Sequence, residues 1–194
     1  MYNTSGVQQW ATSYNGHGNS VDAATQIKLD SQFNVYVSGH SDGGATDLDI
    51  ATLKYNNSGV QQWVSRYNGL LNFFDVPEAL FVDASNNVYV AGRFQLTVDF
   101  DPGAGTNNLS AKGDFDAFAL KLDKNGAYQW VNALGGTGRD ASQAVYASPG
   151  GSSYFTGRKG NNHYTRKLDA SGAVAWSHDY VIHTGRAHGY SIVQ

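Results

Sequence analysis

Three aspartates recur at one position of a repeated sequence, each eight residues before a turn: Asp22, Asp75 and Asp140. Carboxylates at an equivalent position in every repeat are typical of a structural task, such as accepting hydrogen bonds from backbone N–H groups of a neighbouring loop. The alternative is a ring of carboxylates that faces a channel and binds a cation or a polar ligand. We favour the structural interpretation and keep the three residues as candidate ligand contacts.

Further acids occur in alternating pairs, before two predicted strands and within an insertion, and their oxygens could bind Ca²⁺. The candidate calcium ligands are Asp47, Asp49, Asp99, Asp101, Asp114 and Asp116. Their spacing is neither that of an EF-hand loop nor that of a nonapeptide calcium repeat. Solvated turns and strand starts are the simpler interpretation, and calcium is the only cofactor that the sequence suggests.

The remaining polar residues indicate no catalytic site. His178, His183 and His188 follow one another at intervals of five residues, which fits neither one helix face nor one strand face. A zinc site needs three or four converging ligands, so we expect exposed loop histidines. No serine occupies a nucleophile elbow, and no glycine motif that binds phosphate precedes a helix. An enzyme would have to use the repeated aspartates with Arg139, and we assign no catalytic residue.

The aromatic residues divide into repeated and unrepeated ones. The four tryptophans occupy one position of the repeat, which indicates packing between units more than a sugar-stacking platform: Trp10, Trp63, Trp130 and Trp176. Phe73, Phe74 and Phe94 are not repeated, so the scaffold does not require them. We therefore predict that these phenylalanines contact a ligand.

The repeat itself is read most directly from its first two copies. Residues 2–16 and 55–69 match at 11 of 15 positions without a gap, and looser copies cover 122–135 and 168–180. Each copy ends a unit of about fifty residues that shows only strand and turn signals, which predicts the blades of a β-propeller.

Within the first full unit we predict four antiparallel strands, at 24–30, 34–39, 50–55 and 60–67. Turns rich in Asn, Asp and Gly separate them. The predicted units are a partial blade at 1–16, full blades at 17–69, 70–135 and 136–181, and the start of another blade at 182–194. The second unit carries an insertion of 14 residues, roughly 95–113, in a loop of the kind that binds ligands on a rigid scaffold.

Several segments resemble the SBBP-type β-propeller repeat of bacterial secreted and surface proteins: LDSQFNVYVSG, VDASNNVYVAG, DFDAFALKLDKNGAYQW and ALGGTGRDASQAV. The resemblance covers nearly the whole chain. It implies an exported or surface-exposed bacterial protein, as part of a longer chain, and carries no catalytic motif. The third unit departs from the pattern, because Ser148-Pro149-Gly150-Gly151 replaces the turn centred on aspartate.

Composition restricts the partners. The 194-residue chain has a formal net charge of −3 and no run of Lys or Arg, so nothing favours nucleic acid or an anionic membrane. No apolar stretch is long enough for a membrane helix, and no signal-peptide pattern is present. The absence of cysteine excludes disulfides and thiolate sites.

The incomplete units at both ends predict open strand edges. We expect either a fragment of a larger ring, which we favour, or half of a ring closed by a second chain. The expected function is a non-enzymatic extracellular scaffold for binding or adhesion to a protein or glycan. The alternatives are an exported propeller enzyme that acts on polysaccharide, as a lyase or glycosidase, and a purely structural spacer.

Overall fold

The computed structural model describes residues 1–18, 21–44, 48–67 and 74–181, and in these ranges it contains β-strands and no helix. Sheet 1 consists of β1 (Asp22–Leu29), β2 (Val35–Asp42), β3 (Leu48–Tyr55) and β4 (Gln61–Tyr67). Sheet 2 consists of β5 (Val76–Val82), β6 (Val88–Phe94), β9 (Asp116–Leu122) and β10 (Tyr128–Leu134). Sheet 3 consists of β11 (Asp140–Ala147), β12 (Ser153–Lys159), β13 (Asn162–Leu168) and β14 (Val174–Tyr180). Each is a four-stranded antiparallel, blade-like sheet, as predicted.

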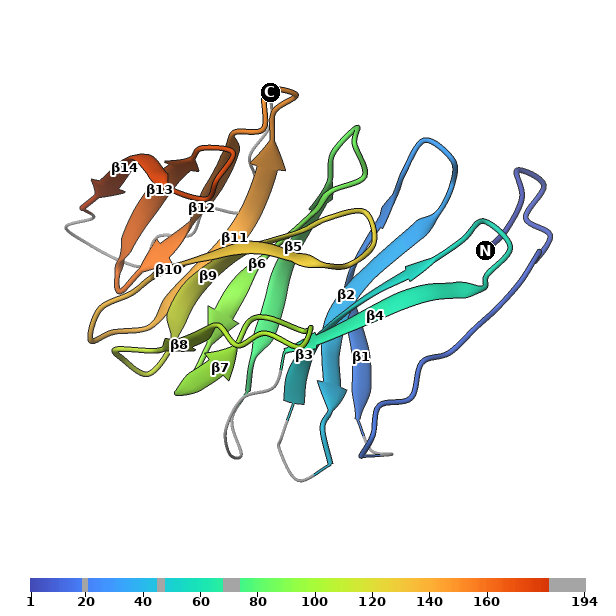
Figure 1. The fold of residues 1–194 in the computed structure, drawn as a ribbon, viewed down its shortest axis with the longest axis horizontal. Helices are drawn as coiled ribbons and strands as arrows, with labels where there is room; N and C mark the ends of the chain where they lie inside the picture. The colour runs from blue at the N-terminus through green and yellow to red at the C-terminus, as the bar shows by residue number, and fades with distance from the viewer. Residues whose placement is uncertain (19–20, 45–47, 68–73, 182–194) are drawn as a thin grey trace.

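The three sheets stand side by side in chain order (Figure 1). The first strands of neighbouring sheets approach one another, since β5 contacts β1 and β2 while β11 contacts β5 and β6. A β-bulge interrupts the first strand pair at the same repeat position in every sheet, after Ala24, Pro77 and Ser142. Bulges increase the local twist of a strand, and the repeated bulge gives the three sheets a similar shape.

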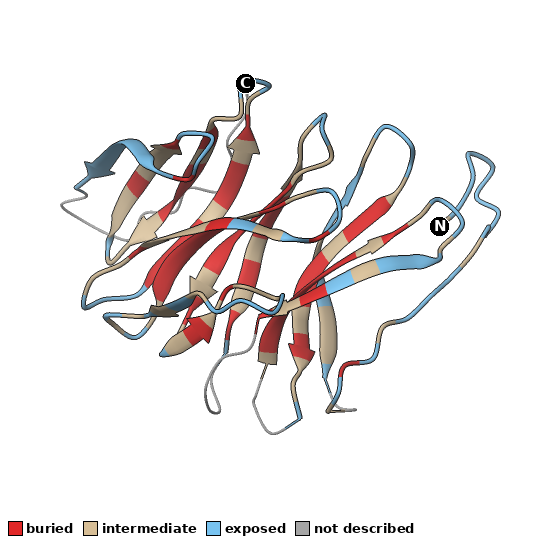
Figure 2. Ribbon diagram, in the orientation of Figure 1, coloured by how far each residue is buried: buried red, intermediate tan, exposed pale blue. Residues whose placement is uncertain are grey.

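The core lies between the sheets rather than within a single sheet, as the buried residues of the central strands show (Figure 2). Between sheets 1 and 2, Tyr36 and Ile50 meet Leu80, Val90 and other apolar residues of sheet 2. Between sheets 2 and 3, Tyr89 and Ala119 meet Val145, Phe155 and Leu168. Sheet 2 therefore buries one face against sheet 1 and the other face against sheet 3.

In sheets 1 and 2 an aspartate side chain stabilises the turn between the first two strands. Asp30 Oδ1 accepts the backbone N–H groups of Gln32 and Asn34 at 2.9 Å, and Asp83 repeats this turn in sheet 2. Burial raises the pKa of Asp30, but hydrogen bonds from Asn34, Gln32 and Tyr36 outweigh it and lower this pKa overall. Ser148 replaces the aspartate in sheet 3 and donates instead to the carbonyl of Ser152 at 3.2 Å, so this turn differs locally, as expected.

The last turn of each unit ends in a glycine with positive φ, which glycine adopts without strain: Gly6 (73°), Gly59 (81°), Gly126 (81°) and Gly172 (86°). Three of these glycines lie under the tryptophan of the preceding unit. Trp130 Nε1 donates to the carbonyl of Ala170 at 3.1 Å, and a Cβ atom at Gly172 would lie 2.6 Å from the Trp130 ring.

The same contact joins Trp63 to Gly126 and Trp10 to Gly59, with hydrogen bonds to Lys124 and Asn57. We call these three Trp–Gly contacts the tryptophan seam. The predicted packing of tryptophans between units is thereby confirmed for Trp10, Trp63 and Trp130.

Two segments differ from the prediction. Residues 1–16 form no extended strand, only an isolated bridge between Tyr2 and Gln8, because no strand of the described ranges lies beside them to supply a hydrogen-bonding ladder. The insertion of the second unit is not a free loop: it forms a hairpin of β7 (Thr97–Asp99) and β8 (Asn108–Ser110). Val98 and Phe100 of this segment are fully buried in the core between sheets 1 and 2.

The described ranges contain no helix that is long and apolar enough to cross a membrane. The predicted start of a further unit at 182–194 lies outside the described residues.

Candidate functional site

The three repeated aspartates lie at one end of the sheets, where β1, β5 and β11 begin; we call this end the rim. Asp140 accepts the N–H groups of Gly136 at 2.8 Å and Gly160 at 2.6 Å, each with one carboxylate oxygen. Asp75 accepts the N–H of Gln95 at 2.9 Å, and Asp22 accepts that of Gly16 at 3.0 Å. The backbone hydrogen bonds expected from the structural interpretation are therefore present in all three sheets.

The same aspartates connect neighbouring sheets through their own backbone. The N–H of Asp75 donates to the carbonyl of Leu48 at 3.1 Å, and the N–H of Asp140 donates to the carbonyl of Phe115 at 2.8 Å. Leu48 and Phe115 are equivalent residues of consecutive units. The aspartates thus form a constant framework of the rim.

Asp75 has a raised pKa. Its carboxyl is almost completely buried, and burial raises its pKa to about 7, with the charge of Asp49 acting in the same direction and the hydrogen bond from Gln95 opposing it. Near neutral pH this carboxyl therefore changes its charge inside the rim.

Three rim positions beside this framework change from sheet to sheet. The residue before the repeated aspartate is Val21, Phe74 or Arg139. The residue after the glycine of the second strand is His40, Arg93 or Arg158. The third position lies at the start of the third strand and is occupied by Leu48, Phe115 or Asn161, directly before Asp49, Asp116 and the equivalent Asn162. Since the backbone is the same while these side chains vary, they can determine what each part of the rim binds.

Where sheets 2 and 3 meet, five of these variable side chains surround a hollow of about 380 Å³, which is lined by Phe74, Val76, Arg93, Phe115, Arg139 and Arg158. Arg93 forms an ion pair with Glu78, and Arg139 Nε lies 2.5 Å from Asp114 Oδ2. Phe115 lies beside both cations, with its ring centroid 5.2 Å from Arg93 Cζ and 5.5 Å from Arg139 Cζ. The hollow is the candidate functional site.

The candidate calcium ligands do not converge: no group of three or more His, Cys, Asp or Glu residues that could hold a metal occurs among the described residues. Asp99 and Asp101 accept backbone N–H groups of their own hairpin. Asp114 pairs with Arg139, and the buried Asp49 lies 3.7 Å from Arg66. Burial raises the pKa of Asp116, which accepts the N–H groups of Lys112 and Gly113, whereas Asp47 lies outside the described residues.

The three phenylalanines that were predicted to contact a ligand differ in their positions. Phe74 is 52% exposed and lines the hollow. Phe94 corrects the prediction, because it is fully buried with its ring centroid 5.3 Å from that of Phe100 in the insertion. Phe73 lies outside the described residues, as do His183 and His188, while His178 is exposed on β14 with its ring 5.3 Å from that of Trp176.

Sequence reasoning missed Arg93, Arg158 and Phe115. Their signal was nevertheless present, since each follows or precedes a repeated marker residue, and aligning the units places them at the rim. Only the structure shows that side chains from two different sheets meet around one hollow.

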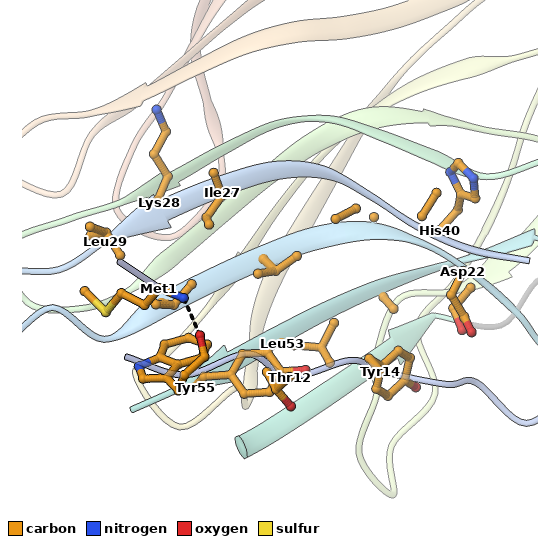
Figure 3. A pocket seen from close by; sticks show the side chains of 18 residues that line it. Met1, Thr12, Tyr14, Asp22, Ile27, Lys28, Leu29, His40, Leu53 and Tyr55 are labelled. Atoms are coloured by element: carbon orange, nitrogen blue, oxygen red, sulfur yellow. Dashed lines mark hydrogen bonds between the residues drawn. The ribbon is translucent and has the colours of Figure 1, made fainter. Parts of the chain in front are cut away.

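A second concave surface lies on the outer face of sheet 1, a groove of about 780 Å³ between β1–β3 and the segment of residues 1–14 (Figure 3). Ile27 and Leu29 line it and are 63% and 50% exposed, whereas Leu80 and Val145, which occupy the position of Ile27 in the other two sheets, are buried. Tyr14, Leu53 and Tyr55 line the same groove. The groove therefore corresponds to the face that sheets 2 and 3 bury against the preceding sheet.

Comparison with known proteins assigns no family to the chain. No protein-family model and no curated protein matches the chain. Among solved structures, the chain is similar to a crystal structure of a protein of unknown function from Bacteroides caccae, with 13% sequence identity and a TM-score of 0.37. The match covers 91% of this chain and 72% of that one. A likeness at this level identifies no family.

Proposed function

We propose that the three sheets are blades of a β-propeller that serves as a non-enzymatic binding scaffold, secreted or at the bacterial cell surface. The propeller is the arrangement that a repeated sheet of four antiparallel strands with a similar bulge, seam and rim supports best. In this proposal the ring is completed by further repeats or by a second chain. Export is what the resemblance to SBBP-type repeats implies.

The unfinished tryptophan seam supports ring completion. Each seam contact uses a tryptophan of one unit and a glycine of the next, and within the described ranges one tryptophan and one glycine are left over. Trp176 is 38% exposed whereas Trp130 is 7% exposed, and no atom lies within 4 Å of a Cβ at Gly6. The groove on sheet 1 and the exposed face of β14 are, in the same way, the two faces that internal sheets bury (Figure 2).

Light scattering tests this part of the proposal. We expect the 194-residue chain to associate head to tail to masses above the 20.9 kDa of one chain, because the two open faces are complementary parts of one interface. A double variant, Ile27→Asp with Trp176→Ala, should return the mass to that of one chain. A wild-type protein that stays monomeric at high concentration would contradict completion by a second chain and leave completion by further repeats, and a change on adding EDTA would indicate that a metal takes part.

The binding role rests on one observation: at the rim a constant framework of aspartates carries side chains that vary from sheet to sheet, and those of sheets 2 and 3 surround a hollow. The hollow's volume of about 380 Å³ lies within the range of ligand sites. Its lining residues include no histidine, tyrosine, lysine or carboxylate that could act as a general base. A binding surface is therefore favoured over the exported enzyme.

A glycan array read beside a product assay separates the three functions. We expect retention on a subset of glycans without release of reducing ends or unsaturated sugars. Product release from any polysaccharide would favour the lyase or glycosidase, and an array without any retained glycan would favour the structural spacer or a protein ligand. Phe74→Ala should weaken retention, whereas Phe33→Ala, an exposed phenylalanine in the turn at the other end of sheet 1, should leave it unchanged.

A further inference from the structure

The hollow between sheets 2 and 3 has an excess of positive charge. Of its three guanidinium groups, Arg93 is matched by Glu78 and Arg139 is matched by Asp114. Within the described ranges Arg158 has no ion pair, and its Nε atom is buried without a hydrogen-bond partner. A buried donor that lacks an acceptor is costly, so the guanidinium group of Arg158, which lines the hollow, is not fully satisfied by the protein.

The neighbouring carboxylate of Asp140 does not fill this role. Asp140 is buried, and its two oxygens already accept the backbone N–H groups of Gly136 and Gly160. Asp179, another acid near this sheet end, pairs with Lys159 at 2.5 Å. The positive charge of Arg158 therefore remains available to a ligand.

The aromatic residues give the hollow a second property. Phe115 holds the Arg93 and Arg139 guanidinium groups by cation–π contacts, which keeps both cations at the edge of the hollow. Phe74 presents an exposed ring that is not required by the repeat. A ligand that matches this surface carries an anionic group on a compact body with an apolar face.

We propose that the hollow binds a uronic-acid residue of an acidic polysaccharide. The sugar carboxylate accepts hydrogen bonds from Arg158, supported by Arg139, since guanidinium groups bind carboxylates in a bidentate geometry. The C–H face of the pyranose ring packs on Phe74, as apolar sugar faces do on aromatic rings. This inference rests on the proposed binding function and specifies its ligand class.

Titration calorimetry with oligogalacturonate tests the inference on the whole chain. We expect binding that weakens with added salt, and no heat with the methyl-esterified oligomer, which has the same sugars without the charge. Arg158→Gln should lower the affinity roughly tenfold or more, the loss expected for one charge-assisted pair. Arg139→Gln, at a side chain that is mostly exposed and outside the core, should weaken binding without any effect on folding.

Lys124→Gln is the matched control, because this exposed cation follows β9 at the end opposite to the rim. It should bind as the wild type does. Equal binding of the esterified oligomer, or undiminished affinity in both arginine variants, would overturn the inference. Binding of neutral glycans alone would overturn it and leave the scaffold proposal standing, whereas the absence of all glycan binding would remove the glycan function with it.

Discussion

Replacing Trp130 by alanine is expected to lower the free energy of unfolding by about 3–5 kcal/mol, the usual cost of removing a buried tryptophan. Trp130 packs on Gly172 and donates to the carbonyl of Ala170, so it joins sheet 2 to sheet 3. Its ring also meets Tyr89 and Phe155 at centroid distances of 6.2 and 6.5 Å. Urea denaturation followed by far-ultraviolet circular dichroism measures the loss.

Trp176→Ala is the matched control, because Trp176 occupies the same repeat position without a following sheet in the described chain. It keeps the contact inside its own sheet, with Tyr154 at 6.2 Å, as Trp130 does with Tyr89. We expect a loss of about 1 kcal/mol or less, as for a partly exposed side chain. Equal losses in the two variants would show that the contact between sheets contributes little to stability.

Asp75→Asn is expected to make the protein more stable above neutral pH and to reduce the dependence of its stability on pH. The folded carboxyl has a pKa of about 7, against 3.8 for an ordinary aspartate, so between these values only the folded state holds the proton. The wild type should therefore lose stability as the pH rises from about 4 to about 7, by on the order of 4 kcal/mol, and change little above. Asparagine carries no charge and can still accept the N–H of Gln95.

Unfolding free energies measured from pH 4.5 to pH 8 test this expectation. The unfolding free energy of Asp75→Asn should still fall somewhat with rising pH, because burial also raises the pKa of Asp116. Asp169→Asn serves as the control: hydrogen bonds from Ser171 and Ala173 lower the pKa of Asp169, so its contribution is lost only at more acid pH. An unchanged slope in Asp75→Asn would mean that water reaches this carboxyl.

Local patterns in the sequence predicted most of the fold. Alternating residues and turns centred on Asp30, Asp83 and Asp123 specify strands and hairpins through contacts a few residues apart, and the structure confirms them. The repeated tryptophans predicted the packing between units, because equal spacing implies equal neighbours. The strand predicted within residues 1–16 is not formed, because a strand there would need a hydrogen-bonding partner that is not local in the sequence.

Contacts made by residues that are not repeated in every unit could not be predicted from the sequence. Phe94 was predicted to be a ligand contact because it is not repeated, but the equally unrepeated Phe100 of the insertion covers it. The hollow needs Arg93, Arg139 and Arg158 together, and these residues come from two sheets. Repeat alignment places each at the rim, yet only tertiary packing decides that they enclose one space.

The Trp–Gly contact between Trp63 and Gly126 uses only residues that every unit contains, as does the contact between Trp130 and Gly172. A gene that gains or loses one unit by recombination would therefore create a junction of the same chemistry, without compensating substitutions elsewhere. Array length is in this sense free to change during evolution, as in other repeat proteins with nearest-neighbour interfaces. The variable rim residues travel with their unit, so each duplication copies a binding surface that can then diverge on its own.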